Sequence, residues 1–149
     1  MKSQEENKEA QSFVLESSLV AVFTDSLKNT DRPFALEDFA LEFDHHGGRV
    51  DLVAISEAGE LWTFEAKLKD WRTAVNQAYR NTSFAHYSYV ILPQEAATNA
   101  FRNERYFAQR GVGLCTIIGS DIVIVIPAAK KEPLRPWITE NAIRYAECA

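Results

Sequence analysis

The middle of the chain alternates between apolar and polar residues with a period of two. The segments that alternate in this way are residues 39–44, 50–55 and 61–68. Successive side chains of a β-strand point to opposite faces of the sheet. In the third segment one face collects Trp62, Phe64, Ala66 and Leu68, whereas the other collects Leu61, Thr63, Glu65 and Lys67. The pattern predicts three strands, the third with one apolar face and with a carboxylate and an amine on its other face.

Apolar residues spaced three or four positions apart predict four helices around these strands. The segments with this spacing are residues 9–28, 70–81, 95–109 and 139–146. Asp70 is placed to be the N-cap or a first-turn acid of the second helix, and Gly111 ends the third. Short apolar runs predict three further strands, over residues 88–93, 113–118 and 122–126.

The resulting order of elements, α-β-β-β-α-β-α-β-β, predicts an α/β sandwich with a mixed central sheet. The 149 residues favour a single domain over residues 1–149. We expect residues 1–8, which are polar, to be frayed at the N-terminus. Residues 127–149 contain three prolines and are expected to form an irregular extension with one short helix.

Composition and charge narrow the class of protein. A hydrophobic content of 46% and a charged content of 25% are typical of a soluble globular protein. No apolar run approaches the ~20 residues that span a bilayer, and the N-terminus is too polar for a signal peptide. Two cysteines do not make a disulfide framework, so we expect a protein of the reducing cytoplasm with no membrane partner. The net charge of −5 argues against non-specific coating of nucleic acid, although the stretch from Glu65 to Arg80 is locally basic.

Three charged residues are candidates for chemistry. Strands 50–55 and 61–68 are joined by a short turn, so pairing would bring Asp51 close to Glu65 and Lys67. Carboxylates are the ligands that Mg²⁺ prefers. Glu16 falls on the apolar stripe of the first helix, either as a rim residue whose stem packs or as another acidic site residue. The adjacent His45 and His46 favour an exposed turn over a zinc site, because no further His or Cys lies at ligand spacing.

The spacing Asp51, thirteen residues, then Glu65-Ala66-Lys67 resembles the signature of the PD-(D/E)XK nuclease superfamily, which includes restriction-endonuclease-like and Holliday-junction-resolvase-like enzymes. The resemblance implies a restriction-endonuclease-like α/β/α sandwich with the core order αβββαβ. It also implies Mg²⁺ or Mn²⁺ bound by Asp51, Glu65 and the main-chain carbonyl of Ala66, with Glu16 as a further candidate ligand.

The same resemblance assigns roles around the metal. Lys67 would act as the catalytic lysine, and Gln77 matches a glutamine that resolvase-like members carry in the following helix. Lys69, Arg72 and Arg80 become candidates for contacts with backbone phosphates. The expected activity is Mg²⁺-dependent hydrolysis of DNA, in repair, recombination or defence.

Other functions stay open at this point. RNA remains an alternative substrate, and a homodimer could form through the apolar segment 122–126 and Trp137. A nuclease-like fold that binds nucleic acid or a protein without cutting is the main alternative function. A small enzyme that uses Glu65 and Lys67 for acid–base chemistry on a metabolite is a third, but no phosphate-binding glycine loop or nucleophile motif supports it.

Overall fold

The structure, a computed structural model, describes residues 13–149. The segment 1–8, expected to be frayed, lies outside this range. Within it one six-stranded sheet has its strands in sequence order, β1 to β6. The strands are β1 (Leu36–His45), β2 (Gly48–Ser56), β3 (Leu61–Ala66), β4 (Tyr87–Ile91), β5 (Gly113–Ile118) and β6 (Asp121–Ile126). All six strands that the alternation and the apolar runs predict are confirmed.

The sheet is mixed. β1, β2 and β3 form an antiparallel meander, whereas β3, β4 and β5 run parallel and β6 returns antiparallel to β5. The two parallel pairs each need a crossover, which the helices between β3 and β4 and between β4 and β5 supply. The predicted order αβββαβ and the predicted class, an α/β sandwich with a mixed sheet, are therefore confirmed.

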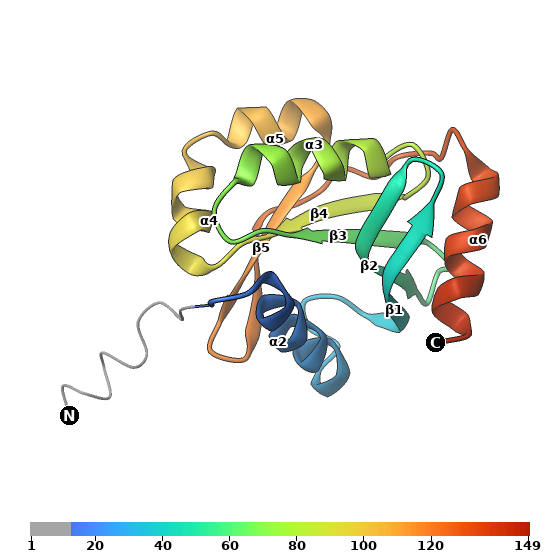
Figure 1. The fold of residues 1–149 in the computed structure, drawn as a ribbon, viewed down its shortest axis with the longest axis horizontal. Coiled ribbons are helices and arrows are strands. Elements are labelled where there is room, and N and C mark those ends of the chain that lie inside the picture. The colour runs from blue at the N-terminus through green and yellow to red at the C-terminus, as the bar shows by residue number, and fades with distance from the viewer. Residues whose placement is uncertain (1–12) are drawn as a thin grey trace.

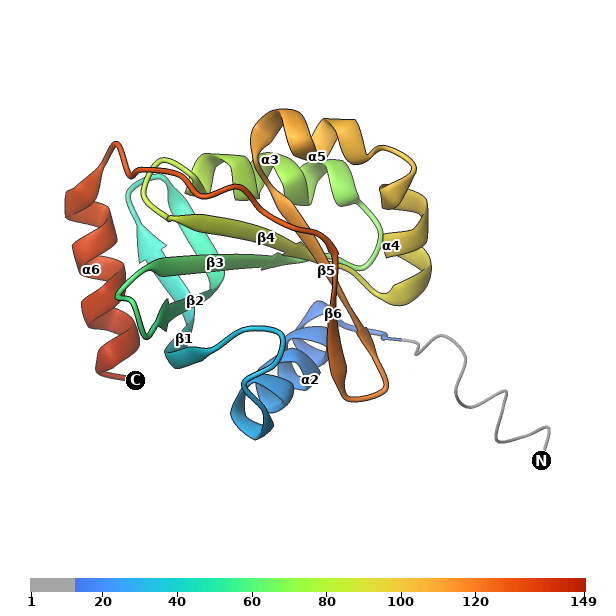
Figure 2. The same ribbon diagram turned by 180° about the vertical axis from the view of Figure 1, so that it is seen from behind.

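Helices cover both faces of this sheet (Figures 1 and 2). They are α2 (Glu16–Asn29), α3 (Trp71–Asn81), α4 (Gln94–Phe101), α5 (Glu104–Arg110) and α6 (Pro136–Glu147). α2 lies on one face, and α3, α4 and α5 lie on the other, while α6 packs beside β1 and β2. Within residues 13–149, no helix is long and apolar enough to cross a membrane.

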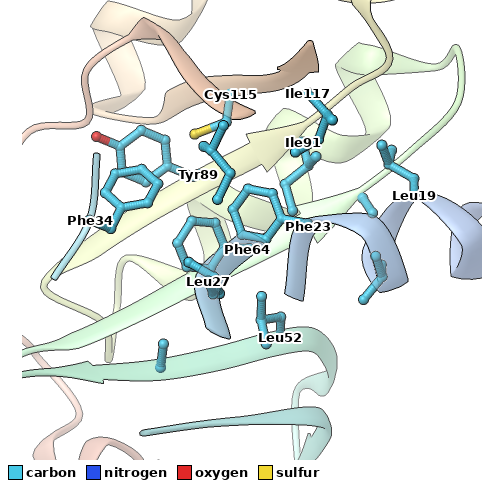
Figure 3. Packing of buried hydrophobic residues seen from close by; sticks show 14 residues of the cluster. Leu19, Phe23, Leu27, Phe34, Leu52, Phe64, Tyr89, Ile91, Cys115 and Ile117 are labelled. Atoms are coloured by element: carbon cyan, nitrogen blue, oxygen red, sulfur yellow. The ribbon is translucent and has the colours of Figure 1, made fainter. Parts of the chain in front are cut away.

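The core between α2 and the sheet is rich in aromatic rings (Figure 3). Leu19, Phe23 and Leu27 recur every four residues, so they share one face of α2 and are buried against the sheet. The Phe23 and Phe64 ring centroids lie 5.0 Å apart. Burying each such side chain contributes about 1.5–3 kcal/mol to folding, so this contact holds α2 firmly against β3.

The opposite face of the sheet carries two separate apolar clusters. One lies under α6 and includes Val53 and Leu61, and the other lies under α3, α4 and α5 and includes Val90 and Leu114. Glu65 is on this same face, since it is two residues from Thr63 and four from Leu61 on β3. The carboxylate therefore points into protein, toward α3, and not into solvent.

Three predicted helices differ from the observed ones. The first, expected over residues 9–28, begins at Glu16 within the described residues, and residues 9–12 lie outside them. The third, expected over 95–109, is broken at Arg102 and Asn103, which buries Phe107 and leaves Phe101 exposed. The last begins three residues before the predicted Thr139, because Pro136 is favourable in the first turn of a helix.

Candidate active site

The site lies where β2 and β3 separate. Their pairing runs from Ile55 and Leu61 to Leu52 and Phe64, and the next residues along are Asp51 and Glu65. Beyond this point the Ala66 backbone N–H donates a 2.8 Å hydrogen bond to Asp51 Oδ2. A carboxylate has thus replaced a main-chain carbonyl as the acceptor at the end of the ladder, which fixes Asp51 beside the backbone of β3.

Glu65 is the buried member of the pair. Only 2% of its surface is exposed, and its Oε2 accepts a 2.7 Å hydrogen bond from Asn81 Nδ2 at the end of α3. Burial, together with the charge of the nearby Asp51 carboxylate, raises the pKa of Glu65 to about 8 against the opposing effect of the Asn81 hydrogen bond. Without a cation, Glu65 is therefore largely protonated at neutral pH.

This arrangement fits a hard divalent cation. One oxygen of each carboxyl group accepts a hydrogen bond from a nitrogen. Glu65 accepts from the Asn81 side chain, and Asp51 accepts from the Ala66 backbone N–H. A cation would offset the repulsion between the two carboxylates and keep Glu65 ionised. Within residues 13–149 no three His, Cys, Asp or Glu side chains gather into a metal-binding group. Mg²⁺ needs no such group, because it is usually held by one or two carboxylates, other oxygens and water.

Lys67 and Glu16 meet at the edge of the site. Lys67 Nζ lies 3.9 Å from Glu16 Oε2, with 28% and 46% of the two side chains exposed. Glu16 and Asp51 also line one cleft of about 390 Å³ between α2 and the β1–β2 hairpin. Glu16 is the first residue of α2 and is exposed, so the expectation that it lies on the buried stripe is wrong. The structure nevertheless brings it to the lysine of the motif.

The side chain of Gln77 makes no hydrogen bond with any described residue, although it is partly buried on α3. Asn81, one turn later on the same face of the helix, makes the contact with Glu65. The resemblance to resolvase-like nucleases assigned a role to Gln77 and none to Asn81. The sequence did contain a signal for Asn81. It lies three residues after Ala78 and seven after Ala74, so it shares the face of α3 that packs on the sheet.

The three basic residues expected to contact phosphates do not form one patch. Lys69 precedes α3 and Arg72 lies in its first turn, where the guanidinium sits 4.7 Å from the centroid of the Trp71 ring. Arg80 lies at the other end of α3, about 12 Å along the helix axis from Arg72. All three side chains are exposed. Lys69 and Arg72 lie at one end of α3, and Arg80 lies at the other.

The paired histidines differ from each other. His46 is exposed in the turn, as expected, but His45 is half-buried as the last residue of β1. Its ring lies 4.9 Å from that of Phe84 and stacks on Phe43, with centroids 5.9 Å apart. Burial, and then the charge of Arg135, lower the pKa of His45, so it is a neutral packing residue at pH 7.

Comparison with known proteins gives a likeness of fold. No protein-family model matches the chain, and no curated protein matches it. A protein of unknown function from Silicibacter pomeroyi is similar in structure, with a TM-score of 0.63 and 18% sequence identity over 92% of this chain and 89% of that one. A repair endonuclease from Pyrococcus abyssi gives a TM-score of 0.46 and 14% identity over 72% of this chain and 49% of that one, too weak a likeness to support an argument.

Proposed function

We propose that this protein is a metal-dependent nuclease that hydrolyses phosphodiester bonds in DNA. The observation that carries the proposal is the meeting of Asp51 with Glu65 where β2 and β3 separate, with Lys67 just beyond the end of β3. Two carboxylates and an amine at a strand end form the minimum set for cation-assisted attack on a phosphate.

In this proposal Mg²⁺ or Mn²⁺ is held by Asp51, Glu65 and the main-chain carbonyl of Ala66, with Glu16 as a further acidic ligand. When bound, the cation would polarise a phosphoryl oxygen and lower the pKa of a coordinated water. The crowding of Asp51 and Glu65 supports this assignment, because a cation between the two groups is what would allow both to be ionised at neutral pH.

The surrounding residues would act on the phosphate and the attacking water. Lys67 can donate hydrogen bonds to a phosphoryl oxygen on which negative charge develops. Gln77 has a free side-chain amide that can orient phosphate or water. Lys69, Arg72 and Arg80 would contact backbone phosphates, which hold a nucleic acid in place without reading its sequence.

The first test is titration of Mg²⁺ and of Mn²⁺ into the wild-type protein and into Glu65→Gln, followed by cation-dependent cleavage of plasmid, branched DNA and RNA. Glu95→Gln, an exposed glutamate on α4, is the matched control. We expect the wild type and the control to bind the cation and cut DNA, and Glu65→Gln to do neither. A wild-type protein that binds no cation and cuts none of these substrates contradicts the proposal.

A nuclease-like module that binds nucleic acid without cutting it is the second candidate. It is favoured by the Asn81 hydrogen bond, which satisfies Glu65 as a buried structural residue without any cation. The same experiment separates the two functions. DNA binding that is unchanged by cations and by Glu65→Gln, with no cleavage, supports the non-catalytic module.

A further inference from the structure

A second cleft, of about 520 Å³, opens at the end of α3. Three elements meet there: the last turn of α3, the turn between β1 and β2, and the segment that leads into α6 (Figures 1 and 2). The side chains used below are His45, Tyr79, Arg80, Glu132 and Arg135, all of which line the cleft. Its volume is that of a small-molecule site, so it holds about one nucleotide and excludes a duplex.

Two arginines line this cleft, and no carboxylate among the described residues binds either of them. Arg80 and Arg135 form no ion pair within residues 13–149, in contrast to Arg49, which is bound by both Glu42 and Asp44. They oppose a single carboxylate, that of Glu132, in a protein whose net charge is −5. The cleft is therefore a local concentration of uncommitted positive charge on an acidic chain, which favours an anionic ligand.

Aromatic rings accompany these charges. Tyr79 lines the cleft and keeps 51% of its surface exposed, so its side chain is accessible to a ligand. His45 also lines the cleft, from the end of β1, and is held in place by its contacts with Phe43 and Phe84. An exposed aromatic ring next to arginines is the combination by which proteins bind single-stranded nucleic acid, because every base has a face that can stack.

Two elements that position the candidate active site also border this cleft. Arg80 precedes Asn81, whose side chain points inward and binds Glu65, while Arg80 borders the cleft. On the other side, Gly47 borders the cleft and lies four residues before Asp51 on the same hairpin. The helix that binds Glu65 through Asn81 and the hairpin that carries Asp51 therefore form two walls of the cleft.

We propose that this cleft binds one unpaired nucleotide of a DNA strand, with its base against Tyr79 and its phosphate between Arg80 and Arg135. The inference rests on the proposed nuclease function and deepens it. Glu132 supplies an acceptor for an amino group of the base. The substrate that follows from this geometry is DNA with an unpaired nucleotide close to the bond that is cut, as in branched or frayed ends.

The test is fluorescence anisotropy with a labelled single strand of about eight nucleotides and a blunt hairpin duplex. It uses the Glu65→Gln protein without divalent cations, so that binding is measured apart from cleavage. We expect preference for the single strand, and a loss of about tenfold in affinity with Tyr79→Ala or with the double variant Arg80→Ala/Arg135→Ala. The control is Arg102→Ala, which removes an exposed arginine that caps the C-terminus of α4 and does not line the cleft, and it should bind as the parent does.

The result that overturns the inference is equal or tighter binding of the blunt duplex, or single-strand binding that neither Tyr79→Ala nor the double arginine variant weakens. Equal weakening by Arg102→Ala also overturns it, because the effect would then be one of overall charge. Failure here is distinct from failure of the proposed function. If the protein cuts DNA in the presence of Mg²⁺ but does not prefer the single strand, the inference about the cleft is wrong and the proposed nuclease function stands.

Discussion

Asn81 Nδ2 donates a 2.7 Å hydrogen bond to Glu65 Oε2, and both side chains are buried, with 4% and 2% of their surfaces exposed. The bond ties the last residue of α3 to the end of β3 across sixteen positions of sequence. It holds the carboxyl group of Glu65 in one orientation. Asn81 is therefore a positioning residue for Glu65, and several consequences can be measured.

Replacement of Asn81 by Ala should destabilise the protein. It leaves a buried carboxyl group without its donor, which costs about 1–3 kcal/mol in free energy of unfolding. Urea denaturation followed by circular dichroism measures the loss. Asn99→Ala, on the exposed side of α4, is the matched control and should be neutral, since alanine is the better helix former. Equal stability of Asn81→Ala and the wild type would show that the bond does not form in solution.

Stability should fall as the pH rises from about 4.5 to about 8 in the presence of a chelator. The pKa of Glu65 is raised from 4.5 to about 8 in the folded protein, so the folded state holds a proton that the unfolded state has released. The stabilisation that the protonated Glu65 contributes is complete below pH 4.5 and is lost as the pH rises through about 8. Each pKa unit of difference corresponds to about 1.4 kcal/mol, so the change should reach a few kcal/mol.

The variant Glu65→Gln isolates this contribution. Glutamine keeps an acceptor for Asn81 but cannot ionise, so the variant should lose the pH dependence and become the more stable protein at pH 8. Denaturation midpoints across this pH range provide the measurement. A wild type and a Glu65→Gln variant with parallel pH profiles would mean that Glu65 titrates at its ordinary pKa in the folded state.

Lys67→Ala should separate cleavage from cation binding. The amine lies beyond the end of β3 and is not an oxygen ligand, so the affinity for Mg²⁺ should stay within a few fold of the wild-type value. The cleavage rate should fall by about 10²–10³-fold, the usual effect of removing a donor that stabilises a developing oxyanion. Lys28→Ala, in the last turn of α2, is the control for loss of a positive charge. Full cleavage activity in Lys67→Ala would remove this residue from the mechanism.

The ion pair between Lys67 and Glu16 should contribute little to stability. The two groups lie 3.9 Å apart and are both partly exposed, so solvent screens their attraction. We expect Glu16→Gln to change the free energy of unfolding by less than about 1 kcal/mol. A larger fall in the affinity for Mg²⁺ with this variant would identify Glu16 as a ligand, and an unchanged affinity would limit it to the pair with Lys67.

A homodimer through β6 is a further prediction. β6 is an edge strand whose five residues from Ile122 to Ile126 include no charge or proline that would block pairing, and Val123 is 37% exposed. Val123→Lys should give a monomer in sedimentation experiments if this edge joins two copies. Ala108→Lys, an exposed position on α5, should leave the assembly unchanged. A wild-type protein that sediments as a monomer contradicts the prediction.

The sequence by itself determined the strands and the proximity of Asp51 to Glu65. Both depend on short-range rules: side chains alternate along a strand, and a turn of a few residues returns one strand beside the other. Asp70 was likewise readable as an N-cap, and it accepts the Thr73 backbone N–H as expected. Features of this kind need no knowledge of the rest of the chain.

Only the tertiary structure decided which side chains complete the site. Asn81 meets Glu65, and Gln77 does not, because the rotation of α3 about its axis is set by the packing of Ala74 and Ala78 on the sheet. Glu16 reaches Lys67 because the docking of α2 brings its first turn to the end of β3. The cleft beside Tyr79 joins residues from three elements far apart in sequence, so no local pattern could have indicated it.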